Sequence, residues 1–129
     1  MTTHRKVLLV EDNPDLAEAL METVRLLGHD VRAVGTGAAA LAAAVADPPE
    51  VVLLDIGLPD LDGYEVARRL RPRLARACLV AVTGYSQPAD RERARAAGFD
   101  RHLAKPVAIE ALEQLLDAGL DAPPAGLLP

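Results

Sequence analysis

The sequence is poor in aromatic residues, and this scarcity narrows the classes of function. Three of the 129 residues are aromatic, and tryptophan is absent. Single-stranded nucleic acid is usually held by stacking on aromatic rings, and duplexes by an excess of positive charge. The net charge is −5, with 19 acidic against 14 basic residues. We therefore expect no nucleic-acid partner.

Cysteine and long apolar runs are also scarce. Cys78 is the only cysteine, so an intramolecular disulfide is excluded, and a reducing cytoplasm fits this composition. The apolar run at residues 7–10 is too short for a signal-peptide core. No stretch approaches the roughly 18 apolar residues of a membrane span. These absences predict a cytoplasmic domain that makes no membrane contact.

Short apolar runs alternate with segments of helical periodicity. The runs are rich in Val, Leu and Ala, which is typical of strands buried on both faces. They occupy residues 7–10, 30–34, 51–54, 78–82 and 101–104. Five strands alternating with five helices predict an α/β domain with a parallel sheet covered on both faces.

Local signals place the helix ends and the end of the domain. Asn13 and Pro14 can begin the first helix, and Gly28 can end it. The segment 62–65 resembles a capping box that opens another helix. We predict one domain over residues 1–118. Residues 119–129 hold three of the ten prolines and no periodicity, so we expect a flexible tail or linker there.

Polar side chains follow four of the predicted strands at the point where each strand ends. They are Glu11, Asp12, Asp55, Thr83 and Lys105. Because the carboxyl ends of parallel strands meet at one edge of a sheet, where open α/β folds place their sites, we expect these residues to converge.

Three clustered carboxylates repel one another unless a proton or a cation lies among them. An all-oxygen ligand set with few protein contacts suits Mg²⁺, and Mn²⁺ is an alternative ion. Lys105 could hold one phosphate oxygen and the hydroxyl of Thr83 another. Since a carboxylate can accept a phosphoryl group, Asp55 could form an aspartyl-phosphate.

Five motifs follow the strands in order, and each is weak by itself. They are Glu11-Asp12, Asp55, Leu58-Pro59-Asp60-Leu61-Asp62-Gly63, Thr83-Gly84 and Lys105-Pro106. In order and spacing the set resembles the receiver domain of response regulators in bacterial two-component systems, over roughly residues 5–118. The sequences of residues 83–85, 97–100 and 103–107 are similar to those of receivers at the C-terminal end of hybrid sensor histidine kinases. We favour that relation over a free-standing regulator.

The resemblance implies a flavodoxin-like, doubly wound sheet of five parallel strands in the order 2-1-3-4-5, with five helices. It implies a signalling switch rather than an enzyme. The phosphoryl donor would be a histidine kinase or a histidine phosphotransfer protein, with a fused kinase domain as one form of partner.

The resemblance also implies a role for each site residue. Asp55 is expected to be the phosphoacceptor and, with Asp12 and the backbone carbonyl of Gly57, a direct metal ligand. Glu11 is expected to act on the metal through a bound water. Thr83 is the expected switch hydroxyl and Lys105 the expected phosphate contact, aimed by a cis bond before Pro106. The family's switch aromatic, three residues before the lysine, is replaced by His102.

That replacement leaves alternatives open. His102 is either a substitute for the aromatic residue or a plain surface residue at the end of a short strand. A receiver-like binding module that works without phosphorylation is the main alternative function. A phosphatase with an aspartate nucleophile is disfavoured, because such enzymes usually carry a second Asp where this chain has Gly57.

Overall fold

The computed structural model describes residues 4–84 and 88–117, in which strands and helices alternate. The strands are β1 (Lys6–Val10), β2 (Asp30–Val34), β3 (Val51–Asp55), β4 (Cys78–Thr83) and β5 (Arg101–Ala104). The helices are α1 (Pro14–Leu26), α2 (Gly37–Ala46), α3 (Gly63–Leu70), α4 (Pro88–Ala97) and α5 (Ile109–Asp117). The predicted strands are confirmed to within one residue at each end. The predicted tail at residues 119–129 lies outside the described residues.

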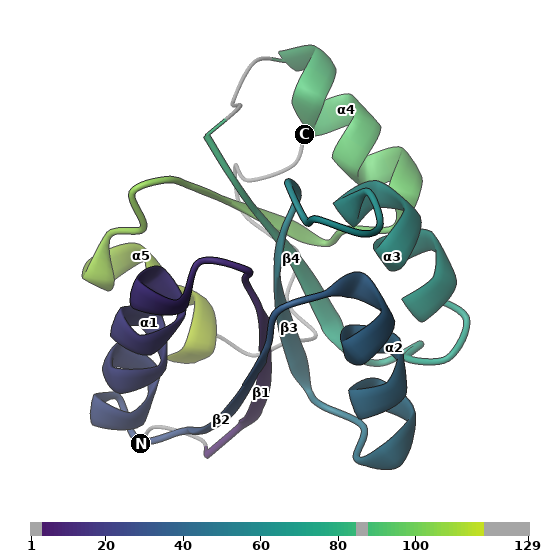
Figure 1. Cartoon of the computed structure of the whole chain (residues 1–129). Coiled ribbons are helices and arrows are strands. Elements are labelled where there is room, and N and C mark those ends of the chain that lie inside the picture. The colour runs from purple at the N-terminus through teal and green to yellow at the C-terminus, as the bar shows by residue number, and fades with distance from the viewer. Residues whose placement is uncertain (1–3, 85–87, 118–129) are drawn as a thin grey trace.

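All five strands are parallel and lie in the order β2-β1-β3-β4-β5, which confirms the predicted fold. Figure 1 shows α1 and α5 on one face of the sheet, and α2, α3 and α4 on the other. The sheet therefore has a core on each face. None of the helices formed by the described residues is long and apolar enough to cross a membrane.

Alternation along the strands divides the apolar residues between these two cores. Leu8 and Val10 pack on the side of α2, α3 and α4, whereas Val7 and Leu9 pack on the side of α1 and α5. Strands β3 and β4 divide in the same way, so every residue of both is buried. Continuous apolar runs result because neither face of these strands meets water. The edge strand β2 is only half-buried.

The predicted helix caps are confirmed, with one exception. The side chain of Asn13 accepts from Asp15 N–H and Leu16 N–H, and Pro14 is the first helical residue of α1. Gly28 has a φ of +94°, which favours glycine after a helix end. Asp62 caps α3 by accepting from Tyr64 N–H at 2.7 Å.

The exception is the reciprocal half of the predicted capping box. The carboxylate of Glu65 turns outward to the guanidinium groups of Arg68 and Arg69. Local charge pairing along α3 therefore competes successfully with the cap.

Two arginines, the part-buried Arg71 and the buried Arg5, connect elements at the end of the sheet where the strands begin. The guanidinium of Arg71 donates to the carbonyls of Leu74, Ala77 and Gly98 and to the carboxylate of Asp100. Arg5, which precedes β1, donates its Nε–H to the carbonyl of Leu116 in α5 at 2.8 Å. The start of the first strand and the end of the last helix are thus direct neighbours.

Candidate functional site

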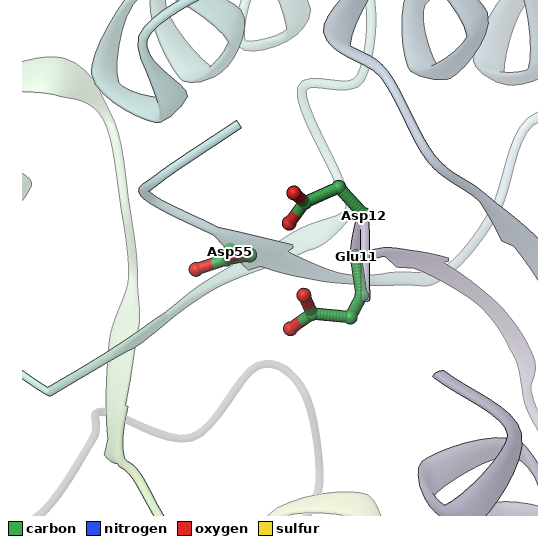
Figure 2. A group of neighbouring side chains, drawn as sticks. All are labelled: Glu11, Asp12 and Asp55. Carbon is green, nitrogen blue, oxygen red and sulfur yellow. The ribbon is translucent and has the colours of Figure 1, made fainter. Parts of the chain in front are cut away.

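Three carboxylates meet at the carboxyl ends of β1 and β3. Glu11 and Asp12 follow β1 directly, and Asp55 is the last residue of β3. Each offers a carboxylate oxygen, and these oxygens lie within 4.8 Å of one another (Figure 2). Glu11 and Asp55 are buried, whereas Asp12 is exposed, so the cluster opens to solvent on one side.

Lys105 joins this cluster from the end of β5. Its Nζ lies 3.1 Å from Oδ1 of Asp55 and 3.2 Å from Oε1 of Glu11. Burial by itself would lower the pKa of Lys105, but the hydrogen bonds and charges of Asp55 and Glu11 outweigh it and raise the pKa above its usual value. The ammonium is therefore a fixed positive charge beside both carboxylates.

The site still carries more negative than positive charge. Burial raises the pKa of Glu11, and the charge of Asp55 adds to that effect, although Asn13 N–H and Lys105 oppose it. An all-oxygen set of three carboxylates around one ammonium fits a small divalent cation, which would relieve the excess charge. The residues present therefore suit a divalent metal site.

Thr83 and His102 lie on one face of the sheet, the face covered by α2, α3 and α4. Thr83 ends β4, and Ala81, two residues earlier on the same face, belongs to that core. In the β4–β5 register, Ala81 pairs with His102 and Thr83 with Ala104. His102 is 8% exposed, so of the two alternatives for this residue the plain surface position is wrong.

The loop between β3 and α3 lies beside the site and packs tightly against the start of α3. Gly57 N–H donates to Oδ1 of Asp55 at 3.3 Å, and Gly63 N–H donates to the carbonyl of Ile56 at 3.0 Å. A Cβ on Gly63 would lie 2.6 Å from Cα of Ile56 and 2.8 Å from the carbonyl oxygen of Asp55. Only glycine lets α3 begin this close to the loop. After β5, the Lys105–Pro106 bond is cis.

The structure brings Glu11, Asp12, Asp55 and Lys105 into one cluster. It places Thr83 at the end of the neighbouring strand and Gly57 in the adjoining loop. The sequence predicted no separate role for Asp60, which stood only within the motif at residues 58–63. Its carboxylate accepts from the first two backbone amides of α2. A signal was present, since α2 has no acidic residue in its own first turn, where helices favour negative charge.

Comparison with known proteins assigns most of the chain to one family. Residues 7–117 match the family described as the response regulator receiver domain. The transcriptional regulatory protein KdpE of Mycobacterium tuberculosis is 36% identical over 104 residues, which are 81% of this chain and 46% of KdpE. The virulence sensor protein BvgS of Bordetella bronchiseptica is 36% identical over 132 residues, covering 93% of this chain and 11% of BvgS.

The chain therefore spans about half the length of one relative and about a tenth of the other. Among solved structures, the chemotaxis protein CheY4 of Vibrio cholerae matches with a TM-score of 0.83 and 25% identity. That match covers 88% of this chain and 97% of CheY4. A family match over residues 7–117, on a five-stranded sheet with its acidic cluster at the strand ends, shows that this chain belongs to the response regulator receiver domains, signalling modules of two-component systems rather than catalytic enzymes.

Proposed function

We propose that this receiver accepts a phosphoryl group on Asp55 from a phosphohistidine of a histidine kinase or phosphotransfer protein, and then changes a protein-interaction face. The observation that carries the proposal is the position of Asp55. Its carboxylate lies at a strand end, 3.1 Å from the Lys105 ammonium and next to two further carboxylates. That setting supplies a nucleophile and opposite charge for the incoming phosphoryl group.

In the proposed reaction, an oxygen of Asp55 forms a bond to phosphorus while the bond between phosphorus and the donor's imidazole nitrogen breaks. The imidazole leaves and takes up a proton from solvent. Lys105 moves its ammonium from the carboxylates to a phosphoryl oxygen, and the Thr83 hydroxyl donates to another. Catalysis in this scheme is positioning and charge neutralisation.

Asp12, Asp55 and the carbonyl of Gly57 are the proposed direct ligands of Mg²⁺, with Glu11 acting through a bound water. When bound, the ion supplies positive charge that offsets both the carboxylates and the phosphoryl oxygens. Mn²⁺ has the same ligand preference and is proposed as a substitute. Thr83 and His102, on the face of the sheet next to α4, are the proposed route from the site to the interaction face.

The test is labelling by a small phosphodonor such as acetyl phosphate, followed by intact mass and phosphate-affinity electrophoresis. Wild-type protein should gain one phosphoryl group in Mg²⁺ and none after chelation. Asp55→Asn should abolish the label. Asp47→Asn is the matched control, because Asp47 pairs with Lys6 and Arg32 at the far end of α2 and should not affect labelling.

Labelling that survives in Asp55→Asn would contradict the proposal. A wild-type protein that neither binds Mg²⁺ nor takes the label would favour the phosphorylation-independent binding module instead. One feature favours this alternative: the buried His102 occupies the position where the family carries an aromatic residue.

A further inference from the structure

The side chain of Asp60 joins the loop between β3 and α3 to the start of α2 by hydrogen bonds. Its Oδ1 accepts from Gly37 N–H at 2.8 Å, and its Oδ2 accepts from Ala38 N–H at 3.0 Å. These two hydrogen bonds lower the pKa of Asp60, as expected for a carboxylate held by backbone donors. The contact joins residues 22 and 23 positions apart in the sequence.

Helix α2 depends on this contact for its first turn. Its own cap, Thr36, accepts from Ala39 N–H through its hydroxyl and from Ala40 N–H through its carbonyl. The two remaining amides, those of Gly37 and Ala38, are the ones that Asp60 binds. The sequence of α2, GAAALAAAVA, has no charged residue, so Asp60 also supplies the negative charge that a helix N-terminus favours.

The start of α2 is joined in turn to the segment that carries Glu11 and Asp12. Glu11 N–H donates to the carbonyl of Val34, at the end of β2, at 3.0 Å. A Cβ on Gly35 would lie 3.9 Å from both the carbonyl oxygen of Glu11 and Cα of Asp12. The turn before α2 is therefore bonded to the segment that follows β1 and lies close enough that one added methyl group would reach it.

Close packing also holds the start of α2 against the β3–α3 loop and α3. A Cβ on Gly37 would lie 2.8 Å from Cγ2 of Val66 and 3.0 Å from Cβ of Leu61. The start of α2 thus abuts the β3–α3 loop with no room for a methyl group. A shift of the loop relative to α2 would break both this contact and the bonds of Asp60.

We propose that Asp60 is a positioning residue for the metal site. Through the start of α2, it fixes the loop that carries Gly57 relative to the segment that carries Asp12. It does not touch the metal. The proposal rests on the proposed function only because that function names Asp12 and Gly57 as metal ligands. The hydrogen bonds between Asp60 and the start of α2 are present in the metal-free protein.

The first readout needs no metal. Amide hydrogen exchange and ¹⁵N relaxation are measured on wild type, Asp60→Ala, Asp60→Asn and Thr36→Ala. Thr36→Ala is the matched control, because it removes a cap from the same helix without touching the loop. Amides of residues 56–58, 60 and 61 should become more mobile in Asp60→Ala, because the loop loses its link to α2. The effect should be smaller in Asp60→Asn, which keeps one acceptor oxygen, and the same amides should remain as in wild type in Thr36→Ala.

The second readout is Mg²⁺ affinity, followed by amide shifts during titration. Outer residues that orient metal ligands typically contribute 10-fold or more to affinity, so Asp60→Ala should weaken Mg²⁺ binding by about 10-fold. Asp60→Asn should be intermediate and Thr36→Ala unchanged. The rate of labelling by acetyl phosphate should fall in Asp60→Ala at low Mg²⁺ and recover at saturating Mg²⁺.

Wild-type loop mobility in Asp60→Ala would overturn the proposal, as would a mobile loop with wild-type Mg²⁺ affinity. Equal losses in Asp60→Ala and Thr36→Ala would also overturn it, by assigning the effect to α2 alone. If wild type itself fails to bind Mg²⁺, the proposed function fails. The metal-free mobility data still decide whether Asp60 holds the loop.

Discussion

His29 is a buried imidazole whose surroundings make its charged form costly. It is 3% exposed, and its Nδ1 accepts from Arg5 N–H at 3.1 Å. Because Nδ1 is an acceptor, the proton of the neutral ring lies on Nε2, which has no hydrogen-bond partner among the described residues. Burial lowers the pKa of His29, and the charges of Arg5 and His4 add to this, against Asp117 and Glu50.

This lowered pKa predicts a pH-dependent stability. The unfolded chain takes up a proton at His29 near pH 6.5, whereas the folded protein resists it. The contribution of His29 is therefore intact above that pH and is lost as the pH falls towards the lower pKa of the folded state. Urea unfolding of wild type between about pH 5 and pH 7.5 should show a free energy that decreases with acidification.

The control for this prediction is His29→Asn, which keeps an acceptor near Arg5 N–H but does not titrate. The difference in unfolding free energy between the two proteins should change across the same pH range. A constant difference would show that His29 is neutral or charged alike in both states.

At the scale of single residues, the sequence predicted those site residues that directly follow a strand. Glu11, Asp12, Asp55, Thr83 and Lys105 all follow apolar runs, and topology alone brings such positions together. The roles of Asp60 and His29 could not be predicted in this way. Each depends on a contact across more than twenty residues, and neither lies in a periodic pattern.

At the scale of elements, local signals fixed the helix starts because each involves residues two or three apart. The long-range contacts of Arg71 could not be predicted from a local sequence signal. Five arginines fall within residues 68–76, and nothing in their order separates the structural one from the rest. Arg68 pairs with Glu65 on the surface, whereas Arg71 connects α3, the turn before β4, the end of α4 and the start of β5.

We predict that Arg71→Met lowers the free energy of unfolding by roughly 2–4 kcal/mol, because it removes the partner of several part-buried carbonyls and of Asp100. Arg71→Lys should recover little, since an ammonium cannot reproduce the planar fork of donors. Arg68→Met, the matched control, should cost less than about 0.5 kcal/mol. Chemical denaturation measures all three, and similar losses at both positions would contradict the assignment.

At the scale of the whole molecule, the two cores share one sheet, and each face of that sheet connects the site to a different set of helices. The face of α2, α3 and α4 carries Thr83 and His102. Helix α4 also contacts α3 on this side: the guanidinium of Arg93 lies 4.2 Å from the ring centroid of Tyr64 and bonds Asp62. A displacement of α4 would therefore disturb the start of α3, which adjoins the loop between β3 and α3.

We predict the extent of the switch from amide NMR spectra. Mg²⁺ should shift amides near Asp12 and Asp55, and beryllofluoride, a phosphoryl mimic, should extend the shifts to Thr83, His102 and α4. In His102→Ala the beryllofluoride shifts should reach Thr83 and stop before α4, because the side chain that we propose carries the change is gone. His102→Tyr should restore them. Full shifts of α4 in His102→Ala would exclude His102 from the route.

The hydrogen bond from Arg5 to Leu116 has a consequence for how such a domain is joined to others. It places the first strand's beginning beside the last helix's end, on the side of the sheet away from the carboxylates. A short peptide could close the domain into a ring there, and circular permutants opened elsewhere should fold. For the same reason, neighbours spliced to either end would attach away from the carboxylates. In the relatives, the segment that matches this domain makes up about half of one protein and about a tenth of another.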